Sequence, residues 1–192
     1  MKDFIEVHNF KKNFGDKVVH RNVSFSVHQG ECLGLIGGSG TGKSVLLRSL
    51  IGLERPDAGA MFFDGIDVTQ LKESQLIEIR KRMAYVFQGG ALFDSMTVFE
   101  NLAYPLRAHT KMTEPEIDQK IRSLLKEFGL AGNEEIFPGS LSGGMQKRVG
   151  LARAIILGPE VVLYDEPTAG LDPYNTRKIQ DLILRMKSKG TT

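Results

Sequence analysis

The chain has 192 residues, of which 41% are hydrophobic and 25% are charged, a composition that excludes a disordered or fibrous protein. Lysine and arginine total 25 and aspartate and glutamate 23, so the net charge of +2 offers no electrostatic footprint for nucleic acid or anionic lipid. No run approaches the roughly 18 apolar residues of a membrane span, and the start MKDFIEVHNF carries acids where a signal peptide has a basic and then an apolar region.

The first third of the chain has the period-two alternation of β-strands. Apolar residues alternate in this way at residues 4–7 and again at residues 23–27. A third apolar run, residues 32–36, leads directly into glycines. We expect Cys32, the single cysteine and so not part of an internal disulfide, to be a small buried side chain in this strand. A helix is predicted from Lys43 to about Leu50, and short strands are predicted at residues 61–63 and 83–87.

The middle of the chain is predicted to be helical. Thr113 and Glu116 have the spacing of a capping box, and apolar residues follow on one face of the helix that they begin. These apolar residues are Ile117, Ile121, Leu124, Leu125 and Phe128. Ser142 is expected to cap a second helix, whose inward side is formed by Val149, Ala152, Ile155 and Ile156.

The last third returns to a strand followed by a helix. Residues 161–164 form the continuous apolar run that a covered parallel strand requires. Asp172 is placed to cap a last helix that begins at Pro173 and stops at Gly190. Strands and helices that alternate around a helical insertion predict an α/β fold with a subdomain.

The strongest chemical motif is GGSGTGKS, which matches the phosphate-binding P-loop between a strand and a helix. Backbone N–H groups of such a glycine-rich loop surround phosphate oxygens, and the helix N-terminus adds positive potential. Lys43 can reach the terminal phosphates, and the Ser44 hydroxyl can bind Mg²⁺. The predicted nucleotide-binding residues of this loop are Gly37, Gly38, Ser39, Gly40, Thr41, Gly42, Lys43 and Ser44.

A pair of acids follows the apolar run of residues 161–164. Asp165 and Glu166 therefore lie at the carboxyl end of a buried strand, where ligands bind in α/β proteins. Asp165 is predicted to hold the water shell of Mg²⁺, and Glu166 to polarise an attacking water as a general base. Such a pair alone is more often a loop boundary, but beside a P-loop it indicates a catalytic site.

The third motif is LSGGM, in which Ser142, Gly143 and Gly144 open a helix and form a second anion site. A simple helix cap is the structural alternative. With this motif the chain resembles the ATP-binding subunits of ABC transporters, whose signature is LSGGQ; Met145 stands at its last position. The resemblance extends over the chain, because three further landmarks follow in order. These are Phe14 before a glycine, Gln88 after a strand, and Asp172 at the end of Ala-Gly-Leu-Asp.

The resemblance implies a particular architecture. It is an α/β P-loop NTPase with a RecA-like core of the ABC ATPase type, an N-terminal antiparallel β-subdomain and a helical signature subdomain. Residues 1–88 and 159–192 would form the nucleotide-binding core with the β-subdomain, and residues 89–158 the helical subdomain.

The resemblance also implies a role for each site residue. Two subunits would form an ATP-dependent homodimer, with each nucleotide between one P-loop and the partner's signature Ser142, Gly143 and Gly144. Phe14 would stack on adenine, with a plain core role as its alternative. Gln88 would contact Mg²⁺ or the attacking water and relay the nucleotide state to a membrane subunit. Asp172 is counted among the nucleotide-binding residues.

One segment is similar to a particular group of ATPases within the resembled family. RKRMAYVFQGGALFDSMTVFENLAYPLR, together with LSGGM, is similar to the ATPases of bacterial MCE-domain lipid transporters, the Mla type. This implies phospholipid transport through a separate integral permease, a cytoplasmic location at the inner membrane through that permease, and an MCE-domain lipid-binding protein as a further partner. The small apolar loop after Gln88 could receive a permease helix. Alternatively, Leu92 and Phe93 pack within the helical subdomain.

Other functions remain as alternatives. These are the ATPase of another ABC transporter such as a small-molecule importer, a non-transport ABC ATPase, and a nucleotide-binding module without turnover. A P-loop kinase or GTPase would share the residues of the loop around Lys43 but has no reason to carry LSGGM.

The C-terminal region departs from the family pattern. In the resembled family the helix that begins at Pro173 is followed by a strand ending in a switch histidine. This chain reaches Thr192 where that strand would begin, and none of its four histidines lies beyond His109. Without this strand, backbone groups of two central strands would lack ladder partners. We expect these residues to be a piece of a longer subunit that by itself is unstable and hydrolyses ATP weakly.

Overall fold

The computed structural model describes residues 3–192, which divide into two compact units. One unit contains the described residues up to Met83 together with Met186–Thr192, and the other is Ala84–Arg185. The predicted division into residues 1–88 with 159–192 and residues 89–158 places its boundaries elsewhere in the chain and stays a prediction.

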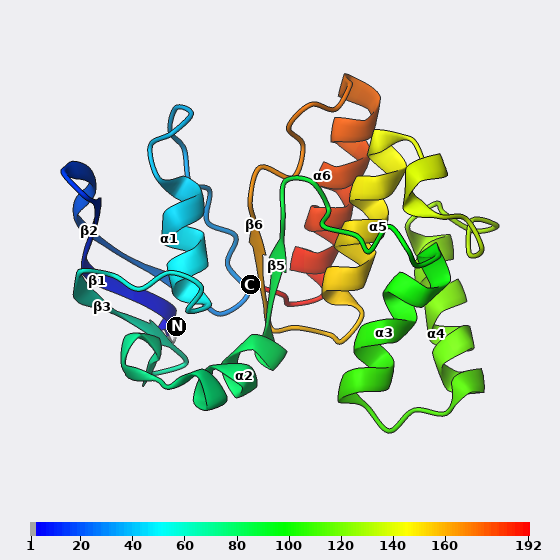
Figure 1. The fold of residues 1–192 in the computed structure, drawn as a ribbon, viewed down its shortest axis with the longest axis horizontal. Helices are drawn as coiled ribbons and strands as arrows, with labels where there is room; N and C mark the ends of the chain where they lie inside the picture. The colour runs from blue at the N-terminus through cyan, green and yellow to red at the C-terminus, as the bar shows by residue number, and fades with distance from the viewer. Residues whose placement is uncertain (1–2) are drawn as a thin grey trace. The chain divides into compact units, whose positions relative to one another are not determined.

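The first unit is built on an antiparallel sheet of four strands in the order β2-β1-β3-β4. Figure 1 labels the first three of these strands. The strands are β1 (Asp3–Phe14), β2 (Lys17–His28), β3 (Ala58–Phe63) and β4 (Ile66–Asp67). In the register of β1, Val7 lies opposite Phe25 on β2 and Met61 on β3. Val7 and Met61 have no exposed surface, so the alternation seen in the sequence does select the buried face. The strands predicted at residues 4–7, 23–27 and 61–63 are confirmed.

The helices of the first unit follow local sequence signals. Helix α1 (Lys43–Leu50) has the predicted bounds and buries Leu46, Ser49 and Leu50. The short 3₁₀ helix η1 (Val68–Gln70) begins where the Asp67 side chain accepts a hydrogen bond from the Thr69 N–H. Helix α2 (Glu73–Arg82) follows and buries Leu76 and Ile79. Arg80 holds α2 to the turn that follows α1, because its guanidinium donates to the carbonyls of Ile51 and Gly52.

One predicted strand is wrong. Residues 32–36 belong to neither sheet of the described chain; Ile36 is fully exposed, and Cys32 is exposed rather than buried. An apolar run becomes a strand only where a neighbouring strand completes its backbone hydrogen bonds. The four-stranded sheet does not include residues 32–36, so the apolar side chains of this segment are not covered by a sheet partner.

The second unit contains a pair of strands and the longer helices. Strands β5 (Met83–Val86) and β6 (Val161–Tyr164) pair with each other and are almost entirely buried; the first residue of β5 falls in the first unit. The predicted strand at residues 161–164 therefore has the predicted bounds, and that at residues 83–87 ends one residue early.

Three helices pack on one another in this unit: α3 (Val98–His109), α4 (Glu114–Glu127) and α5 (Gly143–Ile155). The Thr113–Glu116 capping box forms at the start of α4 as predicted. Most of the predicted inward residues are buried, while Leu124 and Ile155 are half-buried. A 3₁₀ turn, η2 (Pro138–Ser140), precedes α5.

The last helix, α6 (Pro173–Ser188), begins at Pro173 as predicted. Asp172 accepts a hydrogen bond from the Asn175 N–H at 3.0 Å, as a cap should. The helix ends two residues before Gly190, whose φ of 92° is the left-handed conformation that terminates helices. Among the described residues, no helix has the length and apolar character needed to cross a bilayer.

Candidate functional site

The phosphate-binding motif forms a tight loop ahead of α1. Gly42 has a φ of 93°, and a Cβ at this position would lie 2.4 Å from Val19 Cγ1 and 2.5 Å from His20 Nε2. Only glycine fits this position. The His20 ring stands beside the loop and its Nε2–H donates to the Gly42 carbonyl at 3.0 Å, a contact that no spacing in the sequence indicates.

Lys43 folds back over the loop that precedes it. Its Nζ donates to the carbonyls of Gly37 and Gly38 at 2.9 and 3.0 Å. The Thr41 hydroxyl also donates to Gly38, at 2.9 Å. The ammonium group is therefore held at the loop and close to the N-terminus of α1, where positive charge and open N–H groups fit phosphate oxygens.

Phe14 lies at the end of β1 and keeps 47% of its surface exposed. The Lys12 ammonium stands 5.0 Å from the centre of its ring. A phenyl ring with this exposure is not a core residue, and a base can stack on an exposed ring.

In the second unit, Asp165 lies directly after β6 and is only 5% exposed. Its backbone N–H donates to the Val86 carbonyl at 3.0 Å, so the strand pairing continues to this residue. The Tyr85 hydroxyl donates to Asp165 Oδ2 at 2.7 Å. Tyr85 is a site residue that sequence reasoning missed, because 80 positions separate it from Asp165.

Glu166 differs from its neighbour in exposure and backbone. It is exposed and has a φ of 47°, a conformation that costs a non-glycine residue about 1–3 kcal/mol and clusters at functional sites. Gln88 lies beyond the end of β5, and its side-chain amide donates to Glu166 Oε2 at 3.4 Å, a long and weak hydrogen bond. The structure thus brings together the two residues predicted to meet the attacking water.

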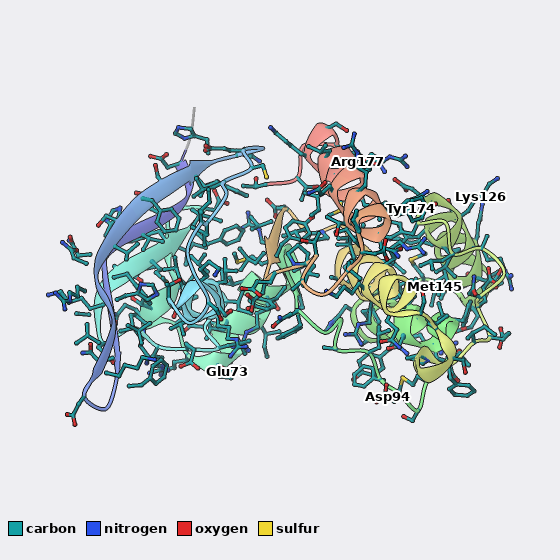
Figure 2. All side chains as sticks on the ribbon, turned by 90° about the horizontal axis from the view of Figure 1, so that it is seen from above. Glu73, Asp94, Lys126, Met145, Tyr174 and Arg177 are labelled. Carbon is teal, nitrogen blue, oxygen red and sulfur yellow. The ribbon has the colours of Figure 1, made fainter. Side chains whose placement is uncertain are left out.

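The signature motif opens α5. Ser142 is the N-cap, and its hydroxyl accepts from the Met145 N–H at 3.3 Å. Met145, labelled in Figure 2, lies in the first turn of this helix. Ser142 and Gly143 are exposed, and the first turn carries no acidic residue, so its free N–H groups suit an anion.

Gly144 and Asp172 meet through one neighbour. A Cβ at Gly144 would lie 2.5 Å from the Asn175 side-chain amide, so a larger residue here would force that amide to move. The side chain and backbone of Asn175 both donate to the Asp172 carboxylate, and these hydrogen bonds hold the pKa of Asp172 below its ordinary value. The start of α5 and the start of α6 are thereby in contact.

A buried polar cluster supports the loop after Gln88. Asn101 is fully buried, and its Oδ1 accepts from the Phe93 N–H and from the Arg153 guanidinium. Arg153 also donates to the carbonyls of Gly90 and Ala91. Burial lowers the pKa of the Arg153 guanidinium from its ordinary value. Neither Asn101 nor Arg153 is indicated as a loop anchor by any motif.

Within residues 3–192, no cluster of three or more histidine, cysteine, aspartate or glutamate side chains could hold a metal ion. A cation would therefore need further oxygen ligands besides one carboxylate. The buried Asp165 carboxylate and the Ser44 hydroxyl are the oxygen donors that Mg²⁺ prefers when nucleotide phosphates supply further oxygens. Each of these two oxygens is of the kind that Mg²⁺ binds, and one lies in each unit. The P-loop belongs to the first unit, whereas the carboxylates, Gln88 and Ser142 belong to the second.

A glycine loop held by Lys43, an Asp-Glu pair after a buried strand and a Ser-Gly-Gly helix start define a nucleotide-binding protein of the P-loop class. The ABC transporter family matches residues 20–169. The chain belongs to this family, which confirms the predicted family and fold class.

Relatives in two groups are similar over nearly the whole chain. The probable ribonucleotide transport ATP-binding protein mkl of Mycobacterium tuberculosis strain H37Rv is 46% identical over 185 residues, 96% of this chain and 52% of the relative. The intermembrane phospholipid transport system ATP-binding protein MlaF of Escherichia coli strain K12 is 41% identical over 174 residues, 91% of this chain and 65% of the relative. The chain thus spans about half the length of the mkl relatives it matches.

Solved structures agree with the family. The ATP-binding cassette MJ0796, a dimer in a post-hydrolysis state with ADP and Pi, has a TM-score of 0.90 at 30% identity; the match covers 98% of this chain and 85% of that one. The structure of cbiO1 from Clostridium perfringens has a TM-score of 0.87 at 27% identity and covers 99% and 76% of the two chains.

Proposed function

We propose that the chain binds and hydrolyses MgATP as the ATP-binding subunit of an ABC transporter. The observation that carries this proposal is the loop in which Lys43 bridges the Gly37 and Gly38 carbonyls ahead of α1. Family membership, and a solved relative that holds ADP and Pi, support it.

Residue roles follow from the motifs that each unit carries. The P-loop N–H groups and Lys43 would bind the phosphates, and the Phe14 ring would stack on the base. Ser44, Asp165 and Gln88 would hold Mg²⁺, which neutralises developing charge on the phosphates when it is bound. Glu166, exposed beside Gln88, would accept a proton from the attacking water.

The P-loop assignment is tested by Lys43→Ala, with Lys11→Ala on the exposed part of β1 as the matched control. Loss of one charge-assisted phosphate contact, worth about 1.5–3 kcal/mol, should weaken binding of a fluorescent ATP analogue about 10–150-fold. Lys11→Ala should bind as the parent does. Unchanged affinity in Lys43→Ala would refute the P-loop assignment.

Glu166→Gln should keep ATP binding and lose turnover. Turnover at the parent rate in this variant would show that Glu166 is not the general base.

A second copy of the chain is the proposed partner across the nucleotide. Ser142, Gly143 and the free N–H groups of α5 would contact phosphate held by that copy. In a Glu166→Gln background, Ser142→Arg should leave ATP binding intact and block the ATP-dependent dimer in analytical ultracentrifugation. Ser123→Arg, on the exposed face of α4, is the matched control. If the ATP-dependent dimer still forms in Ser142→Arg, Ser142 is only a helix cap and does not contact the nucleotide of the second copy.

The proposed second partner is an integral membrane permease, with phospholipid as the transported substrate and an MCE-domain protein in the same system. The exposed side chains of Phe93, Tyr104, Ile136 and Phe137 would form its docking surface. The Phe93 ring contacts Tyr104 edge-on and lies under Arg153, while remaining 43% exposed. Through the permease, the subunit would lie on the cytoplasmic face of the inner membrane.

The similarity to mkl favours ribonucleotide transport as a second candidate. Co-purification with a permease, followed by reconstitution in liposomes, would distinguish phospholipid transport from ribonucleotide transport. We expect ATP-dependent movement of a labelled phospholipid and no uptake of labelled ribonucleotide. Recovery of the protein with ribosomes or DNA instead of a permease would overturn the transporter assignment.

A further inference from the structure

The Asp165 carboxylate, a proposed magnesium ligand, accepts a hydrogen bond from a residue for which no role was predicted from the sequence. Tyr85 lies in β5 between Ala84 and Val86, and its hydroxyl donates to Asp165 Oδ2 at 2.7 Å. The Asp165 N–H donates in turn to the Val86 carbonyl at 3.0 Å. Asp165 is therefore bound to β5 through both its backbone and its side chain.

A hydrogen bond of this kind restricts the orientation of the carboxylate. Asp165 is 5% exposed, so little water reaches it, and an O–H donor to a carboxylate is among the stronger hydrogen bonds in proteins. With its backbone anchored in the strand pairing, the remaining freedom of Asp165 lies in its two side-chain torsions. The Tyr85 hydroxyl limits both of them.

The donor is itself held in place. The Tyr85 ring packs against the Phe87 ring, with centroids 4.5 Å apart and planes tilted by 49°. The two residues lie two positions apart and so share one side of the extended chain. The hydroxyl is thus presented to Asp165 by a packed aromatic pair, a preorganised arrangement rather than a chance contact of a mobile side chain.

We propose that Tyr85 is a positioning residue for Mg²⁺, because its hydroxyl orients the Asp165 carboxylate toward the cation of the bound nucleotide. This rests on the proposed function, in which Asp165 contributes to the magnesium site. Groups that orient metal ligands typically change metal affinity about 10–100-fold when they are removed.

The test is the magnesium dependence of nucleotide binding in the full-length protein. A fluorescent ATP analogue is titrated with MgCl₂ in the parent, in Tyr85→Phe and in Tyr174→Phe, which removes the same atom from a tyrosine that is 68% exposed. Tyr85→Phe should raise the half-saturating Mg²⁺ concentration about 10-fold, leave binding in EDTA unchanged, and keep the ring packing. Tyr174→Phe should behave as the parent.

The same titration in an Asp165→Asn background locates the effect. There Tyr85→Phe should add no further shift, because the carboxylate that it orients is gone. An unchanged magnesium dependence in Tyr85→Phe, beside a shift in Asp165→Asn, would overturn the positioning role alone. A full shift that persists in the Asp165→Asn background would overturn it as well. If Asp165→Asn itself causes no shift, the magnesium assignment under the proposed function fails, and this proposal fails with it.

Discussion

Replacing Asn101 by alanine should destabilise the second unit by removing the anchor of the loop after Gln88. Asn101 lies in α3, fully buried, and its Oδ1 accepts from the Phe93 N–H at 2.9 Å. Its Nδ2 stands 3.0 Å from the Phe93 carbonyl and 3.1 Å from the Met96 carbonyl. Alanine supplies none of these contacts, so the groups that made them lose this partner.

The magnitude follows from the groups that lose this partner. A buried polar group without a partner costs about 1–3 kcal/mol. Two groups are counted, the Phe93 N–H and one carbonyl, because Phe93 is 43% exposed and water can reach part of this loop. The Arg153 guanidinium, which also donates to Asn101 Oδ1, keeps its hydrogen bonds to the Gly90 and Ala91 carbonyls and is not counted. Asn101→Ala should therefore cost about 2–6 kcal/mol, a large part of a typical stability of about 5–15 kcal/mol.

The assay is urea unfolding followed by circular dichroism, with amide hydrogen exchange as a local measurement. In the parent the Phe93 N–H should be protected, and in Asn101→Ala it should exchange faster than the α4 amides. Gln119→Ala, on the exposed face of α4, is the control and should stay within about 0.5 kcal/mol. A loss below about 1 kcal/mol with unchanged exchange at Phe93 would refute the anchoring role.

Two further predictions concern backbone approach and pH. A Cβ at Gly150 would lie 2.8 Å from the Gly90 Cα, so Gly150→Ala should lower the free energy of unfolding in urea by about 1–3 kcal/mol. A Cβ at Gly143 meets nothing within 4 Å, so Gly143→Ala is the control and should be close to neutral. Equal stabilities of the two variants would contradict the contact between Gly150 and Gly90. The backbone N–H and hydroxyl of Thr113 donate to Glu116 and lower the pKa of that carboxyl below its unfolded value. Its stabilisation is therefore full above the unfolded pKa and is lost as pH falls through the folded pKa. The stability gap between the parent and Glu116→Gln should shrink from about pH 6 to about pH 3, and a constant gap would exclude the charged capping box.

Some features of this protein follow from short stretches of its sequence. The helix at Lys43–Leu50, the capping box of Thr113 and the Ser142 cap depend on residues within one or two turns of each other, and all form as predicted. Motif chemistry is equally local, since loop glycines and an adjacent lysine suffice to indicate phosphate binding. Family membership could therefore be predicted before any coordinates existed.

Other features depend on partners distant in the chain. Residues 32–36 carry a strand pattern, yet neither sheet of the described chain includes them, and Cys32 is exposed as a result. An alternating or apolar pattern indicates a propensity to form a strand. The backbone hydrogen bonds of a sheet also need a neighbouring strand, which the local sequence does not specify. The half-burial of Leu124 and Ile155 has a similar origin, because the exact edge of a helix face depends on what covers it.

The sequence by itself determined the kind of site: a phosphate loop, a strand-terminal carboxylate pair and a second helix start suited to an anion. Only the tertiary structure decided which side chains hold those groups in place. His20 meets the Gly42 carbonyl across 22 positions, and Tyr85 meets Asp165 across 80. Spacing in the sequence reports contacts within one element, whereas contacts between elements arise from strand register and helix packing, and those are settled only when the core closes.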